Sequence, residues 1–165
     1  MVRDVLTKAE EVIRKNRYMV LATSSSDGRP WANVVFYAFD KDFNFYFLSA
    51  IDSLHAENIA KDQHIAFVIY DSSQPIGSFL SVQAKGKVSE VGKDRINKVI
   101  SLYSDRLFPK SELSPLQRYP MNEYLEPSEF RFFRIEPEEI DVSGITERRT
   151  KVSMKGEEEE ITGVE

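Results

Sequence analysis

The stretch "WANVVFYAF", residues 31–39, decides the fold that this sequence predicts. Successive side chains of a β-strand point to opposite faces, and here both faces are apolar. A strand with one face in water would instead alternate apolar with polar residues. We therefore expect this strand in the middle of a β-barrel, with a helix, a ligand or a second copy of the chain packed outside it. One face carries Trp31, Val35, Tyr37 and Phe39, and the other carries Ala32, Val34, Phe36 and Ala38.

Periodic patterns on both sides of this strand predict the other elements. Apolar residues at helical spacing predict an amphipathic helix at the start of the chain, and Asp27-Gly28 favours a tight hairpin turn before residue 31. Further strands are predicted from runs rich in aromatic and β-branched residues. The predicted order is a helix, strands near 18–23, 31–39 and 43–49, a short helix through residue 60, strands 64–70 and 79–91, a helix over 93–107, and a last strand from about 130.

The chain has 165 residues, 41% of them hydrophobic, which suits one domain with one core. We expect this domain to span residues 1–145, with the N-terminal helix included. Residues 146–165 form a charged tail with the run Glu157 to Glu160, which predicts a mobile segment.

Composition excludes several classes of function. The net charge of −5, from 27 acidic and 22 basic residues, gives no electrostatic reason to bind nucleic acid or an anionic membrane. The absence of cysteine excludes disulfides, thiolate metal sites and cysteine nucleophiles, so redox chemistry needs a bound cofactor. No apolar run approaches the ~18 residues of a membrane span, and the N-terminus does not resemble a signal peptide. We therefore expect a cytoplasmic protein.

Motifs for common enzyme chemistries are missing as well. The sequence has no G-x-G-x-x-G, no P-loop and no G-x-S-x-G, which argues against a Rossmann dinucleotide site, nucleotide hydrolysis and a triad hydrolase. The two histidines are not spaced as metal ligands, so no metal site is predicted. No catalytic residue can be assigned.

The stretch "LSAIDSLHAENIA", residues 48–60, is the candidate binding site. Ser49 ends an aromatic strand, whereas Ser53 and His55 fall in the first turn of the following helix. A helix N-terminus offers unpaired N–H groups and a positive dipole end, so these side chains could complete a phosphate site. The alternatives are that the serines are a strand end and a helix cap, and that His55 faces solvent.

Three segments carry a resemblance to a known family: "YMVLATSSSDGRPWANVVFYAFD", "FNFYFLSAIDSLHAENIAKDQHIAFVIYD" and "FRFFRIEP". They resemble the pyridoxamine 5′-phosphate oxidase-like, FMN-binding split-barrel family over Tyr18 to Val91 and Phe130 to Pro137. The resemblance implies a mainly β fold, a six-stranded Greek-key split β-barrel with flanking α-helices. It also implies a homodimer with FMN at the dimer interface. The implied cofactor-binding positions are Asn33, Val34, Val35, Phe36, Leu48, Ser49, Ser53 and His55.

Several cationic positions of the family are replaced in this chain. The family's arginine on the second strand falls on Asn33, the following lysine falls on Ala38, and its S-R-K motif becomes Ser53, Leu54 and His55. Losing two permanent cations removes charge-assisted bonds of ~1.5–3 kcal/mol each, and an unperturbed imidazole is charged only below ~6.5. FMN is the expected cofactor, and FAD, a deazaflavin and haem remain alternatives.

The implied function is an FMN-dependent oxidoreductase that passes hydride or electrons between NADH or NADPH and a small acceptor. The alternatives are a non-catalytic module that binds flavin or another planar cofactor, and a split-barrel dimer without a cofactor. The late arginine-histidine substrate motif of the true oxidase is not visible between Lys110 and Phe130, so vitamin-phosphate oxidation is not expected. The sequence does not indicate the substrate.

Overall fold

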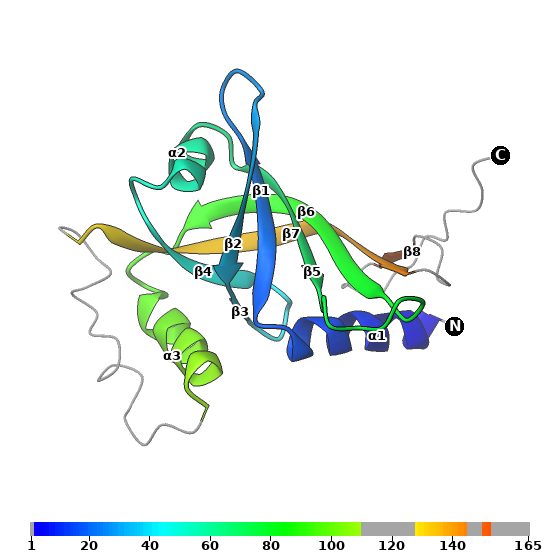
Figure 1. Ribbon diagram of the computed structural model, residues 1–165. Coiled ribbons are helices and arrows are strands. Elements are labelled where there is room, and N and C mark those ends of the chain that lie inside the picture. The colour runs from blue at the N-terminus through cyan, green and yellow to red at the C-terminus, as the bar shows by residue number, and fades with distance from the viewer. Residues whose placement is uncertain (1, 110–127, 145–149, 153–165) are drawn as a thin grey trace.

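The protein is described here by a computed structural model that covers residues 2–109, 128–144 and 150–152 (Figure 1). These residues form a mainly β structure, with one curled antiparallel sheet and three helices. No helix among these residues is long and apolar enough to cross a membrane. The elements are α1 (Val2–Lys15), β1 (Tyr18–Ser24), β2 (Pro30–Phe36), β3 (Ala38–Phe39), β4 (Phe45–Ala50), α2 (Leu54–Lys61), β5 (His64–Tyr70), β6 (Leu80–Glu90), α3 (Ile96–Leu107), β7 (Phe130–Gly144) and β8 (Thr150–Val152).

The sheet curls so that the strands at its two ends are consecutive in the sequence. The strand order is β2-β1-β5-β6-β7-β4-β3, and β8 pairs with β7. The two strands at the ends of this order, β2 and β3, are separated in sequence only by Tyr37. One bent stretch of chain therefore pairs with β1 on one side and with β4 on the other, which closes the sheet into a barrel.

The barrel-like, mainly β class is confirmed, but the number of strands differs from the prediction. Eight strands are described where six were predicted. The strand predicted over residues 31–39 is divided at Tyr37, where pairing with β1 ends and pairing with β4 begins. The eighth strand, β8, falls in the segment predicted as a charged tail. The rest of that tail lies outside the described residues.

Aromatic and branched side chains fill the barrel, and α1 closes one end of it (Figure 1). The amphipathic pattern of α1 buries Ala9, Val12 and Ile13, as the sequence predicts. Inside the barrel, the rings of Phe45 and Phe67 lie 4.9 Å apart. This packing makes a single core continuous from the helix into the barrel.

Helix α3 provides the layer outside the doubly apolar strand, although it covers only one end of that strand. The ring of Phe36 lies 4.9 Å from that of Tyr103 on α3, and Ala38 is fully buried beneath the same helix. At the other end Trp31 and Val34 remain 45% and 64% exposed. The predicted outside layer is thus a helix at the Phe36 end of the strand. At the Trp31 end, no described residue forms such a layer.

Tyr37 and Arg106 together tie the bend of the barrel to the end of α1. The Tyr37 hydroxyl points at the carbonyl oxygens of Ile13 and Asn16, at 2.7 and 2.9 Å. The guanidinium of Arg106, on α3, donates to the same two carbonyls and lies 4.8 Å from the centre of the Tyr37 ring. Burial raises the pKa of Tyr37, so the hydroxyl keeps its proton and remains a donor.

We expect Tyr37→Phe to lower the free energy of unfolding by about 1 kcal/mol, because it removes a buried donor while Arg106 still serves both carbonyls. Urea unfolding followed by circular dichroism measures this change. Tyr70→Phe, at an exposed position at the end of β5, is the control and should have no comparable effect. Equal stability of the two variants would show that the Tyr37 hydroxyl does not fasten the barrel to α1.

Candidate functional site

Three side chains meet where β4 ends and α2 begins. The Oγ atoms of Ser49 and Ser53 lie 3.0 Å apart, and Nε2 of His55 lies 2.6 Å from Ser49 Oγ and 3.3 Å from Ser53 Oγ. Ser49 is buried, whereas Ser53 and His55 are half-buried. The sequence predicted that these residues converge, and the structure brings them together. We call them the hydroxyl-histidine cluster.

Ser53 also caps α2. Its backbone is extended, and its Oγ accepts from the N–H of Ala56 over 3.4 Å. Its hydroxyl donates to the carbonyl of Ala50 over 2.8 Å. Hydroxyl groups rotate to suit their partners, so the same groups can donate to an anion that enters the cluster. The capping role and a binding role therefore use one geometry.

The environment of His55 favours the neutral imidazole. The ring lies 6.3 Å from the fully buried ring of Phe47, and burial lowers the pKa of His55. A neutral imidazole has one N–H donor and one acceptor nitrogen. His55 can thus serve an anion as a hydrogen-bond donor at neutral pH, without supplying a positive charge.

Asn58 fixes α2 on the barrel, and the sequence analysis did not single it out. Asn58 is buried, and its Nδ2 donates to Thr23 Oγ1 on β1 over 3.1 Å. Ala56 and Ile59 are buried on the same helix. An amide close to Ala56 and Ile59 in a short helix is the available signal, because an amide that is buried requires a partner.

The predicted residues of β2 lie in three different environments. Val35 points into the barrel, Val34 is exposed outside it, and Phe36 packs against α3. Asn33 is partly buried, and its Oδ1 atom is fully buried without a hydrogen-bond partner. An unpaired buried amide oxygen is unfavourable unless a ligand or water donates to it.

The structure does not bring every predicted site residue into one contact set. Leu48 lies on the face of β4 opposite Ser49. It packs against the buried apolar side chains beneath α3 and not against the hydroxyl-histidine cluster. Within the described part of the chain, no hydrogen bond links Asn33 to the hydroxyl-histidine cluster. Two positions at which the family has a cation also differ in their surroundings, since Ala38 is fully buried and Leu54 is 45% exposed. A lysine at position 38 would lie under α3.

The family model of pyridoxamine 5′-phosphate oxidase matches residues 5–144. Similar solved structures include a protein of unknown function from Agrobacterium tumefaciens, 21% identical, with a TM-score of 0.70 over 91% of this chain. The heme binding protein from Mycobacterium smegmatis is 17% identical, with a TM-score of 0.71 over 90% of this chain. The heme storage protein HutZ from Vibrio cholerae is also 17% identical, with a TM-score of 0.63 over 78% of this chain and 87% of its own.

The chain spans 61% of the Agrobacterium protein and 57% of the Mycobacterium protein. No curated protein matches the sequence. At these identities the structures share a fold with this chain, and the likeness carries no further statement about activity.

We expect the imidazole of His55 to titrate below the ordinary histidine pKa of ~6.5, because burial disfavours its charged form. The unfolded chain then binds the proton more tightly than the folded chain, so the free energy of unfolding falls as the pH drops below ~6.5. NMR titration of the histidine ring protons gives the pKa, and His55→Gln assigns the signal. His55→Gln should also reduce the acid sensitivity of stability. A His55 pKa above the ordinary value would contradict the neutral form.

Proposed function

The chain belongs to the pyridoxamine 5′-phosphate oxidase family, and from this premise we propose that it is an FMN-binding flavoprotein with oxidoreductase activity. The observation that carries the proposal is the convergence of Ser49, Ser53 and His55 at the N-terminus of α2. In the proposed function this cluster holds the FMN phosphate, on a split barrel of the Greek-key type.

Two hydroxyls, an imidazole N–H and the helix N-terminus are all donors suited to a phosphate. The cluster contains no carboxylate that would repel an anion. Asp52, which directly precedes Ser53, is exposed, and no hydrogen bond links its side chain to the three cluster residues. Without a permanent cation, the phosphate is held mainly by neutral donors. We therefore expect weaker binding than a family member with arginine and lysine at these positions would show.

The orphaned Oδ1 of Asn33 supports a place for the flavin ring along β2. It is an acceptor in a strand whose neighbouring side chains are apolar, and an N–H at the edge of a planar heterocycle would satisfy it. The main chain of Val34, Val35 and Phe36 continues this strand beside Asn33, and we propose that the flavin ring lies along it. Asn33 thus fits the group that the fold family implies, in place of the arginine usual there.

The flavin, when bound, supplies the transfer of hydride or electrons between NADH or NADPH and a small acceptor. The chain's own residues position the cofactor, donate hydrogen bonds and exclude water from one of its faces. No side chain needs to act as a general acid or base for this role, so no catalytic residue is assigned.

We place the flavin at the interface of a homodimer. Ala32 and Val34 form an exposed apolar patch on the outside of β2, at the end that α3 does not cover. A second copy of the chain packed there would bury this patch and cover the cofactor. This would supply the missing part of the outer layer that the sequence of residues 31–39 predicts.

Haem is the second candidate, since structurally similar proteins from Mycobacterium smegmatis and Vibrio cholerae are heme-binding and heme storage proteins. The neutral imidazole of His55 favours this alternative, because neutral histidine is a metal ligand. FAD and a deazaflavin would use the same phosphate donors. A carrier or sensor that binds one of these groups without turnover shares the site and differs only in lacking an acceptor.

The visible absorption spectrum of the purified protein tests the proposal directly. Flavin bands, or saturable quenching of the fluorescence of Trp31 by added FMN, support the flavin site. Reduction by NADH or NADPH and repeated reoxidation by an acceptor then separate an enzyme from a binding module. A haem spectrum, or neither bands nor quenching, would overturn the FMN assignment.

Ser53→Asp and His55→Gln should each weaken FMN binding by roughly tenfold or more. Aspartate keeps the capping role at the start of α2 but repels a phosphate, so Ser53→Asp should leave riboflavin binding unchanged. Titration of Trp31 fluorescence gives both affinities. His64→Gln, on an exposed residue paired with Asp62, is the control. Unchanged FMN affinity in both cluster variants would remove the phosphate from this place.

Val34→Asp should convert the proposed dimer to a monomer, because it puts an unpaired charge in the centre of the apolar patch. Light scattering coupled to size-exclusion chromatography measures the mass. Ser72→Asp, at an exposed position in the loop after β5, adds the same charge elsewhere and should leave the dimer intact. A wild-type monomer, or a Val34→Asp dimer, would exclude this surface as the interface.

A further inference from the structure

A polar cavity lies on the outside of the barrel, beside the start of α3. It has a volume of about 280 Å³. Its floor is a row across three neighbouring strands, in which Arg134 of β7 lies between Tyr46 of β4 and Ser89 of β6. Its wall is formed by Glu90, Val91, Gly92, Asp94 and Arg95, in the segment that leads into α3. Because Tyr46 and Ser49 lie on opposite faces of β4, the cavity is separate from the hydroxyl-histidine cluster.

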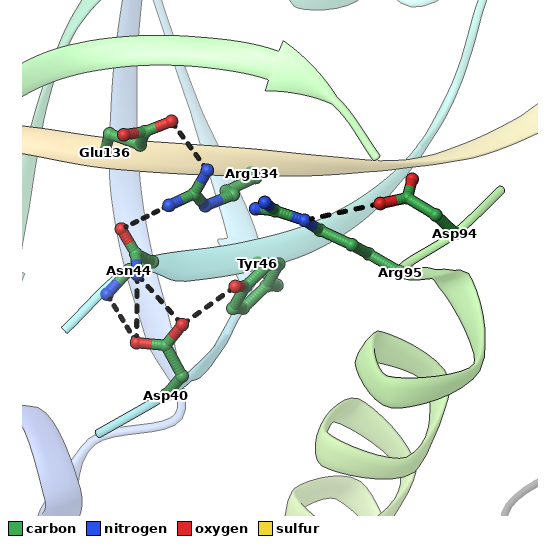
Figure 2. Close-up of polar contacts among 7 residues, drawn as sticks. All are labelled: Asp40, Asn44, Tyr46, Asp94, Arg95, Arg134 and Glu136. Carbon is green, nitrogen blue, oxygen red and sulfur yellow. Dashed lines mark hydrogen bonds and ion pairs between the residues drawn. The ribbon is translucent and has the colours of Figure 1, made fainter. Parts of the chain in front are cut away.

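Arg134 is held in place but has a donor to spare. Its guanidinium donates to Glu136 over 2.7 Å and to Oδ1 of Asn44 over 3.1 Å (Figure 2). Its Nε atom is buried and has no hydrogen-bond partner. Asn44 is fixed in turn by Asp40, which also accepts from the Tyr46 hydroxyl over 2.9 Å. The floor of the cavity is therefore pre-organised around an unpaired N–H.

Arg95 brings a second guanidinium to the same cavity. Figure 2 shows its side chain extending from the start of α3 towards Arg134. Its one polar contact within the described residues is a loose ion pair with Asp94, 3.6 Å from Nε. Two guanidinium groups that line one cavity repel each other, and an anion between them would relieve the repulsion.

The position of Arg95 is also unfavourable for the helix that it starts. Arg95 is the N-cap of α3 and makes no side-chain capping bond there. Caps are usually serine, threonine, aspartate or asparagine, and a positive charge at a helix N-terminus opposes the helix dipole. A residue that disfavours its local structure and gains no stabilising contact there marks a candidate functional position.

Three carboxylates near the cavity are paired with arginines, and that of Asp94 has the loosest pair, with Arg95. Glu90 is paired with Arg131 over 3.1 Å, and Glu136 is paired with Arg134. The Tyr46 hydroxyl is committed to Asp40, and burial together with this carboxylate raises the pKa of Tyr46 to about 12. Guanidinium groups have no acceptor, so the ligand must present acceptor oxygens.

We propose that this cavity binds a small organic oxyanion, through a carboxylate or phosphate group held between Arg95 and Arg134. The oxyanion accepts from the terminal amino groups of Arg134 and of Arg95, and the Ser89 hydroxyl lies at the same floor. A cavity of about 280 Å³ has room for a small metabolite around that group. The site does not depend on the proposed flavin.

The test is an NMR titration of the full chain with inorganic phosphate and, separately, with succinate, at constant ionic strength. The backbone amides of Gly92 and Arg95 and the side-chain Nε–H of Arg134 report on the cavity. We expect a saturable shift of all three signals with at least one probe. The probe that binds more tightly distinguishes a phosphate ligand from a carboxylate ligand. The Ser53→Asp background removes phosphate binding at the hydroxyl-histidine cluster, and the shifts should persist in it.

Arg95→Gln should weaken binding about tenfold or more, because it removes a charge-assisted partner. The exposed position and the opposing helix dipole mean that this variant should fold with unchanged or higher stability. Lys93→Gln removes the same charge from a neighbour that does not line the cavity, and it should change the affinity by less than about threefold. Absence of saturable shifts with both probes, or equal affinity of Arg95→Gln and the unaltered chain, would overturn the proposal.

Discussion

The hydrogen bonds at the end of α1 are the constraint on which the rest of the structure depends. The carbonyls of Ile13 and Asn16 receive both the Tyr37 hydroxyl and the Arg106 guanidinium. Tyr37 is the residue at which one strand leaves β1 and joins β4, and Arg106 belongs to the helix that covers this bend. A helix end, the closure of the barrel and the position of α3 are therefore fixed by one group of contacts. The unpaired carbonyls at a helix C-terminus make this possible.

Once the barrel is closed, β4 has two different surroundings. Its inward face ends in Ser49 beneath the start of α2, and its outward face carries Tyr46 and Leu48 towards α3. The helices α2 and α3 thus begin near opposite faces of the same strand. Polar side chains lie at the start of each helix. The start of α2 has the hydroxyl-histidine cluster, and the start of α3 has Arg95, which lines one cavity with Arg134 of β7. The two proposed sites follow from this alternation.

The apolar patterns of the sequence predicted most elements and much of the first site. The meeting of Ser49, Ser53 and His55 was predictable because strand end and helix cap are close in sequence. The strand over residues 31–39 was predicted as one element, and its division was missed because Tyr37 is held by the carbonyls of Ile13 and Asn16, which are distant in sequence. Asn58 and Arg134 were missed for the same kind of reason. Their partners, Thr23 and Asn44, are distant in sequence and close only after folding.

The sequence by itself determined the mainly β class, the amphipathic N-terminal helix and the residue types that can hold an anion, because periodicity and side-chain chemistry are local properties. Only the tertiary structure decided which end of the doubly apolar strand α3 covers, which leaves Val34 exposed and Ala38 buried. It also decided that the Nε of Arg134 has no partner and that Arg95 reaches the same cavity. The physical reason is that burial and unsatisfied hydrogen bonds depend on which distant segments meet, and no local pattern encodes that meeting.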